Sequence, residues 1–156
     1  MSTNSHFKDL LRTFNDYQIK YLVVGGYTVM NYAEPRYTKD IWVGTEKENA
    51  TAVFKALKVF GAPLSGITER DFTLEGYFYQ IGVPPVRIDI LMSMKGLRFE
   101  DAWERRVESD LDGVKAFFIS REDLINSKKL VGRPRDLADA EALALSDTPW
   151  NPEKPS

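Results

Sequence analysis

The stretch that decides the fold is Tyr21-Leu-Val-Val-Gly-Gly-Tyr27, which is followed thirteen residues later by Asp40-Ile41-Trp42. Its first four residues form a short apolar run, which is typical of a strand buried on both faces. The pair Gly25-Gly26 ends this strand, and glycines there let the backbone approach a bulky group such as a phosphate chain. Asp40 opens the next predicted strand, where a carboxylate could hold a divalent cation against that chain.

The spacing of apolar residues predicts one α/β domain built around a mixed sheet. We expect residues 1–148 to form this domain and residues 149–156, which hold three prolines, to form a flexible tail. The order is strand, helix, strand and helix, then more strands, then a C-terminal helix pair. Helices are expected at 5–16, 27–33, 46–60, 99–106, 121–131 and 134–145. Strands are expected at 21–24, 40–44, 76–81, 86–91, 106–109 and 114–119, and a loop at 62–74.

The composition excludes several classes of function. A net charge of -2, from 21 basic and 23 acidic residues, gives no basis for tight binding to duplex DNA. The chain has no cysteine, so it has neither disulfides nor a thiolate metal site. His6 is its only histidine, which argues against a Ser-His or Cys-His nucleophile. No apolar run approaches the roughly 20 residues of a membrane span, and no signal peptide is visible, so we expect a cytoplasmic protein.

Two aspartates are the strongest candidates for chemistry. Asp40 and Asp89 each lie in an apolar, β-branched frame, where a carboxylate without a partner is costly to bury. Aspartates from different strands could meet at one edge of the sheet and share a Mg²⁺ ion. The alternative is that each pairs with an arginine such as Arg36 or Arg87. The spacing alone leaves both interpretations open.

Two further features have a functional and a structural interpretation. Gly25-Gly26 could form a nest of backbone N–H groups for phosphate, or could simply permit a tight turn. It is neither a Walker loop nor a dinucleotide fingerprint. The second feature is the charged break between the last two helices, which could grip a triphosphate or an RNA backbone. Taken alone, it is better explained as a solvated, internally paired surface. Its members are Lys128, Lys129, Arg133, Arg135, Asp136 and Asp139.

Four motifs in this order resemble the nucleotidyltransferase superfamily, across roughly residues 7 to 146. They are Leu22-Val-Val-Gly-Gly26, Pro35-Arg-Tyr-Thr-Lys-Asp40, the segment Gln80 to Leu91, and Asp123-Leu-Ile with the run Gly132-Arg-Pro-Arg-Asp-Leu-Ala-Asp139. The chain is most similar to small bacterial nucleotidyltransferase-like proteins of abortive-infection and toxin–antitoxin systems. The resemblance implies a nucleotidyltransferase fold, with a mixed sheet flanked by helices.

This resemblance also implies an activity. Members use an NTP with Mg²⁺ (or Mn²⁺) to move a nucleoside monophosphate onto a hydroxyl of a tRNA or a protein, and some act with a cognate toxin or antitoxin partner. By resemblance Asp40 is a metal ligand, and Asp89 is the third acid of the site, acting as ligand or as base. Both would therefore be catalytic and metal-binding residues.

The same resemblance assigns the nucleotide contacts. Gly25 and Gly26 would contact the triphosphate, and Arg36 and Thr38 match the segment that leads into the acidic strand. Lys128 falls on the family's recurrent lysine before the Gly-Arg-Pro run, where it could neutralise phosphate charge. These five positions are the expected nucleotide-binding residues.

The chain departs from the family pattern at the second acid. Relatives commonly read Asp-hydrophobic-Asp-hydrophobic-Trp, whereas this chain reads Asp40-Ile41-Trp42-Val43. A two-residue deletion explains this, and it keeps each remaining side chain on its original face because strands alternate with period two. The strand then survives but its paired acids do not, so Mg²⁺ affinity should fall. Glu46 or Glu48 could substitute, although no spacing argument places them there. The alternative function is a catalytically impaired nucleotide-binding or interaction module of a toxin–antitoxin type system.

Overall fold

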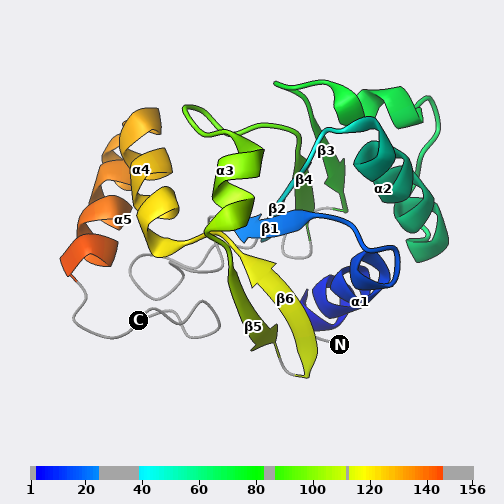
Figure 1. Ribbon diagram of the computed structural model, residues 1–156, viewed down its shortest axis with the longest axis horizontal. Helices are drawn as coiled ribbons and strands as arrows, with labels where there is room; N and C mark the ends of the chain where they lie inside the picture. The colour runs from blue at the N-terminus through cyan, green and yellow to red at the C-terminus, as the bar shows by residue number, and fades with distance from the viewer. Residues whose placement is uncertain (1–2, 25–38, 83–86, 112, 146–156) are drawn as a thin grey trace.

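The computed structural model describes residues 3–24, 39–82, 87–111 and 113–145. Within these ranges the chain forms one six-stranded mixed sheet with helices on both faces (Figure 1). The helices are α1 Thr3–Asp16, α2 Lys47–Phe60, the 3-10 helix η2 Glu69–Thr73, α3 Phe99–Glu104, α4 Arg121–Val131 and α5 Pro134–Leu145. The strands are β1 Tyr21–Val24, β2 Lys39–Val43, β3 Phe78–Ile81, β4 Ile88–Leu91, β5 Val107–Leu111 and β6 Val114–Phe118.

The sheet has the strand order β3-β4-β2-β1-β6-β5. β1 pairs antiparallel with β2 and parallel with β6, and β2 pairs parallel with β4. The two edge strands, β3 and β5, each form an antiparallel pair with their neighbour. The predicted mixed sheet with flanking helices and a C-terminal helix pair is therefore confirmed. The predicted helix at 27–33 lies outside the described residues.

The strands β1 and β2 are buried on both faces, as the continuous apolar run of β1 predicts. Tyr21, Val23 and Ile41 pack in the cluster that α1 and α2 cover. Leu22 and Trp42 point the other way, into a second cluster with side chains of α3, α4 and α5. This alternation fixes which face of the sheet each candidate residue occupies.

The C-terminal helix pair begins and ends where its sequence predicts. The Ser120 hydroxyl accepts a hydrogen bond of 3.1 Å from the Asp123 backbone N–H, which caps the first turn of α4. Gly132 ends that helix with φ 76°, a conformation that glycine adopts without a steric penalty. Pro134 then starts α5, where a missing N–H costs nothing.

One element was missed by the sequence prediction. Residues 62–74, expected to be a loop, contain η2, whose Phe72 is fully buried against the α2 side of the sheet. Thr68 and Asp71 close its first turn with a capping box. A single buried aromatic leaves too little periodicity in the sequence to reveal so short a helix.

Candidate functional site

The sheet brings the two candidate aspartates together. β2 and β4 run parallel, and their register pairs Asp40 directly with Asp89. Neighbouring strands lie about 4.8 Å apart, and paired residues project from the same face. Asp40 is also the partner of Val24, the last residue of β1 before the glycine pair. The two acids thus form one row with the end of β1.

Arg87 is a charged neighbour of Asp89 in this row. Its Nε lies 3.2 Å from Asp89 Oδ1, and its Nη2 donates a hydrogen bond of 3.4 Å to Oδ2. The predicted alternative, an arginine partner, is therefore present for Asp89. Burial raises the pKa of Asp89, and the charge and hydrogen bond of Arg87 offset only part of that rise. A carboxylate with a raised pKa is a stronger proton acceptor.

The donor set fits one divalent cation. Asp89 Oδ1 is buried and accepts no hydrogen bond from the residues that the structure describes, because its contact with Arg87 Nε lacks hydrogen-bond geometry. Two neighbouring carboxylates offer the hard oxygen ligands that Mg²⁺ prefers. Within the described ranges, however, no three histidine, cysteine, aspartate or glutamate side chains converge. The arrangement suits one cation shared by Asp40 and Asp89, with its other ligands from phosphates and water.

Trp42 is a core residue and not part of the acid row. It lies two residues after Asp40 on the same face of β2, and only 1% of it is exposed. Its ring packs edge-to-face against Phe99 of α3, with centroids 5.1 Å apart. β2 keeps an unbroken four-pair register with β1. The strand is therefore intact despite the missing acid.

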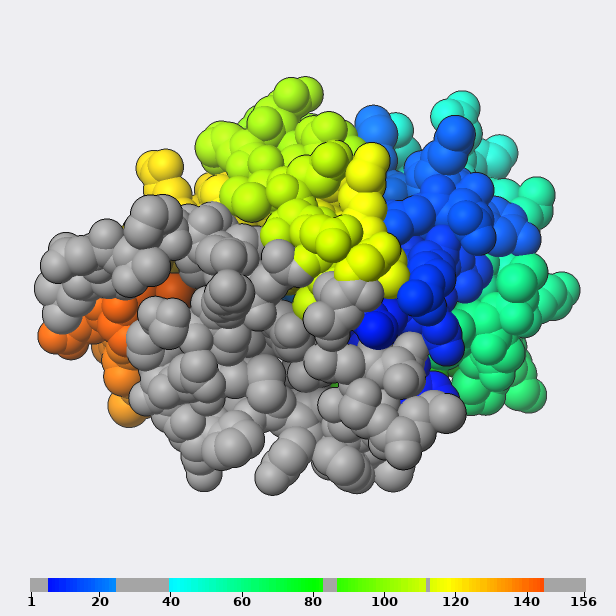
Figure 2. All heavy atoms as spheres, turned by 90° about the horizontal axis from the view of Figure 1, so that it is seen from below, coloured from blue at the N-terminus to red at the C-terminus, as the bar shows by residue number. Residues whose placement is uncertain are grey.

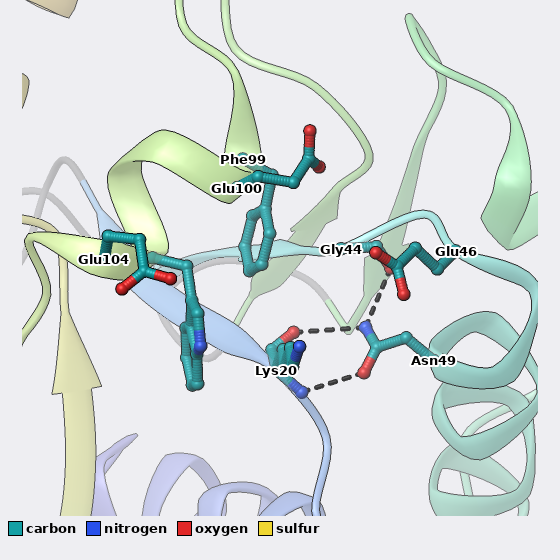
Figure 3. A pocket seen from close by; sticks show the side chains of 8 residues that line it. Lys20, Gly44, Glu46, Asn49, Phe99, Glu100 and Glu104 are labelled. Atoms are coloured by element: carbon teal, nitrogen blue, oxygen red, sulfur yellow. Dashed lines mark hydrogen bonds between the residues drawn. The ribbon is translucent and has the colours of Figure 1, made fainter.

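Glu46 and Glu48 do not replace that acid. Gly44 follows β2 four residues after Asp40, and four strand residues span about 13 Å. Glu46 lines a cavity of about 160 Å³ beyond this far end of β2 (Figure 3). Glu48 lies in the first turn of α2, which starts there. The suggestion that either could replace the second acid is wrong, because both residues follow the end of β2 that lies opposite the acid row.

The cavity at that far end is built around a structural asparagine. Asn49 Nδ2 donates to the carbonyl oxygens of Lys20 and Gly44 at 3.1 and 2.8 Å, and its Oδ1 accepts from the Lys20 N–H at 2.8 Å (Figure 3). These bonds tie α2 to the start of β1 and the end of β2. The Asn49 amide is thus committed to the fold rather than to a ligand.

The charged break between α4 and α5 is an internal ion cluster. Lys128 Nζ lies 3.8 Å from Asp136 Oδ1 and 3.5 Å from Asp139 Oδ2, and the Arg133 Nε donates to Asp136 Oδ2 at 2.6 Å. Both aspartates are only 2% exposed. Burial raises the pKa of Asp136, but Arg133 and Lys128 together outweigh it and lower the value overall.

This cluster corrects the expectation of a solvated charged surface for the two aspartates. Lys129, Arg133 and Arg135 are exposed as expected, and the expected internal pairing is present. The i, i+3 spacing of Asp136 and Asp139 identifies one helix face but does not say whether that face packs inward. Lys128 is 14% exposed at its side chain, so a phosphate could reach it only in exchange for these partners. Its nucleotide-binding role stays a prediction.

Four of the predicted nucleotide contacts, Gly25, Gly26, Arg36 and Thr38, lie outside the described residues. Sequence reasoning also missed a neighbour of the acids. Gln80 of β3 pairs with Asp89 across the next strand and extends the row to the edge of the sheet. The sequence does carry a signal for this: only four residues, starting with Gly82, separate the predicted strands at 76–81 and 86–91, and this spacing is typical of a hairpin.

Comparison with known proteins adds one finding. A family model described as a nucleotidyltransferase of unknown function (DUF6036) matches residues 3–149. None of the curated proteins searched matches the chain. Across the described ranges, no helix has both the length and the apolar character that a membrane span needs.

Proposed function

This chain belongs to that family of nucleotidyltransferases of unknown function, and from this we propose that it moves a nucleoside monophosphate from an NTP onto an acceptor hydroxyl, with Mg²⁺ or Mn²⁺ as cofactor. The observation that carries the proposal is the register of β2 and β4, which places Asp40 beside Asp89. Val24, which precedes the glycine pair in the sequence, completes this row. The acceptor class is a tRNA or a protein.

In the proposed reaction the acceptor oxygen attacks the α-phosphorus of the NTP. A new P–O bond forms, the bond between the α-phosphorus and the bridging oxygen breaks, and pyrophosphate leaves. Asp89 takes the proton of the acceptor hydroxyl as the general base. A bound Mg²⁺ ion would neutralise phosphate charge and stabilise the attacking and leaving oxygens.

Three side chains prepare this step. Asp40 and Asp89 would hold the cation between them, because they occupy paired positions on one face. Arg87 balances the charge of Asp89 before substrates bind. Its guanidinium can then turn to a phosphate oxygen, which accepts hydrogen bonds in the same geometry as a carboxylate.

A second candidate function rests on a specific observation. Only two acids meet in the part of the chain that the structure describes, and position 42 belongs to the core. A protein with this donor set could bind nucleotide without transferring it, as the interaction module of a toxin–antitoxin type pair. Nucleotide binding that does not depend on metal would favour this alternative.

The test is incubation with labelled NTPs, Mg²⁺ or Mn²⁺, and total tRNA. Transfer by the wild type should be lost in Asp40→Ala and in Asp89→Ala. Asp101→Ala, which removes an exposed carboxylate from α3, is the matched control and should behave as wild type. Transfer that persists in both acid variants would contradict the proposal. Absence of transfer, with calorimetry showing metal-independent NTP binding, would support the second candidate.

A further inference from the structure

The edge strand β3 presents two exposed side chains on the face that carries the acids. Tyr79 and Ile81 pack against the α2 side of the sheet, and Tyr79 contacts the buried Phe72 edge-to-face at 5.9 Å. Strand side chains alternate, so Phe78 and Gln80 point to the opposite face. Their cross-strand partners agree, because Gln80 pairs with Asp89 and Phe78 with Leu91.

This part of the sheet face is open. Phe78 is 59% exposed, and Gln80 is also exposed, while the residues between and after them are half-buried. Directly paired antiparallel residues have Cβ atoms about 5 Å apart, and diagonal neighbours lie about 7–8 Å apart. An amide therefore adjoins the Asp89 carboxylate directly, and an uncovered aromatic ring lies one diagonal step away.

The strand order shows which substrate this surface would meet. Along the sheet, β1 comes first, then β2 with Asp40, then β4 with Asp89, then β3. If the triphosphate lies near the glycine pair after β1, the acceptor hydroxyl approaches from the side of Asp89, its proposed base. Among the described strands, β3 follows that base and forms the edge of the sheet. Phe78 and Gln80 thus lie on the acceptor side.

The loop that follows β4 carries two exposed basic side chains. Met94 and Leu97 pack against the cluster that contains Trp42, so the turn between them lies over the face that carries the acids. That turn exposes Lys95, and Arg98 follows it with its side chain 75% exposed and a 3.5 Å ion pair to Glu100. The Met92 N–H donates to the Tyr77 carbonyl, which holds the start of this loop beside β3, whereas Gly96 in the turn lies against Leu130 of α4.

From this arrangement we infer that Phe78 and Gln80 form the subsite for the unpaired terminal nucleobase of an RNA acceptor. The ring of Phe78 stacks on the base, and the Gln80 amide donates to and accepts from its edge. The turn that carries Lys95 lies over the same face, and its positive charge would attract the RNA backbone. This inference rests on the proposed function, and it selects an RNA over a protein as the acceptor.

The test uses the full chain and a short single-stranded RNA with 2-aminopurine as its 3′-terminal base. Stacking on Phe78 quenches the fluorescence of the base, so titration gives an affinity. Base stacking on aromatic side chains is strong enough that Phe78→Ala should weaken binding by about 5- to 150-fold. Phe78→Trp should retain binding. Tyr77→Ala, which removes an equally exposed ring one position away, should leave the affinity unchanged.

A second titration separates the acceptor from the incoming nucleotide. 2-Aminopurine riboside triphosphate should bind Phe78→Ala as it binds the wild type. If Phe78→Ala weakens the triphosphate and not the RNA, the ring serves the nucleotide and the assignment to the acceptor is overturned. Unchanged RNA binding in Phe78→Ala, or no RNA binding by the wild type, also overturns the subsite.

The outcomes remain distinguishable from failure of the proposed function. If Asp89→Ala abolishes transfer while Phe78→Ala leaves the KM for RNA unchanged, the transfer reaction stands and the subsite falls. If transfer does not depend on Asp40 or Asp89, the proposed function falls whatever Phe78 does. Exposure of Phe78 could also mark an interface between two copies of the chain, and sedimentation tests this. If Phe78→Ala dissociates a dimer and leaves RNA binding intact, β3 is such an interface and the subsite is overturned.

Discussion

Replacing Trp42 by alanine tests whether this residue is structural, as its burial indicates. The side chain is 1% exposed and its indole packs edge-to-face on Phe99 with centroids 5.1 Å apart. Truncation of a fully buried tryptophan costs about 3–5 kcal/mol, of which the aromatic pair contributes about 0.5–1.5 kcal/mol. In a domain of 156 residues each kcal/mol shifts Tm by about 2–4 °C. We therefore expect Trp42→Ala to lower Tm by about 6–20 °C.

The assay is thermal and urea unfolding, each followed by circular dichroism, with Trp42→Phe and Trp103→Ala alongside. Trp42→Phe keeps a ring against Phe99, so it should cost only about 1–2 kcal/mol. Trp103 is half-buried, and its loss should cost less than that of Trp42. Any nucleotide transfer by folded Trp42→Phe should match the wild type. A cost below about 1 kcal/mol for Trp42→Ala, or loss of transfer in stable Trp42→Phe, would refute a purely structural role.

Three further predictions concern pH and packing. Burial raises the pKa of Asp89 in the folded state, so ionisation of this carboxyl destabilises the fold. The free energy of unfolding of Asp89→Asn, measured with urea, should therefore rise relative to that of the wild type as pH increases above about 4. Asp136 has a lowered pKa in the folded state, so its ionised form stabilises the fold above about pH 4 and this effect is lost in acid. Asp136→Asn should lower the free energy of unfolding by about 1–3 kcal/mol at pH 7. A difference from the wild type that does not shrink as pH falls would contradict the pairing with Arg133. Gly96→Ala should lower the free energy of unfolding by about 1–3 kcal/mol, because φ is 78° and a Cβ would collide with the Leu130 side chain. This loss should appear as a lower Tm, and an unchanged Tm would refute the contact.

Much of the fold is predictable because local signals and packing agree. The apolar run of β1, the Ser120 cap and Gly132 each report a backbone state that depends on a few adjacent residues. The acid pair is also foreseeable, since carboxylates in apolar strands need a partner or a metal. The pairing of β2 with β4, which sets Asp40 opposite Asp89, confirms that the two strands are neighbours. The catalytic role of the two aspartates stays a prediction.

The remaining features depend on how the segments pair and pack. The short connection indicates that β3 lies beside β4, but their register, which places Gln80 opposite Asp89, is set by the whole sheet. The sequence predicts that the charged residues Asp136 and Asp139 lie on the surface. They are buried instead, because Lys128 and Arg133 pair with them between α4 and α5. Such pairings become visible only once the packing is known.

The most direct test of the account is the number of divalent cations that the acid pair holds with nucleotide. Electron paramagnetic resonance of free Mn²⁺, titrated with protein and a non-hydrolysable NTP analogue, counts the bound ions per chain. Ions held by the analogue alone are subtracted in a titration without protein. We predict one protein-dependent Mn²⁺ per chain, lost in Asp40→Asn and in Asp89→Asn and retained in Asp101→Asn. Two ions per chain, or one that survives both acid substitutions, would contradict a shared site at Asp40 and Asp89.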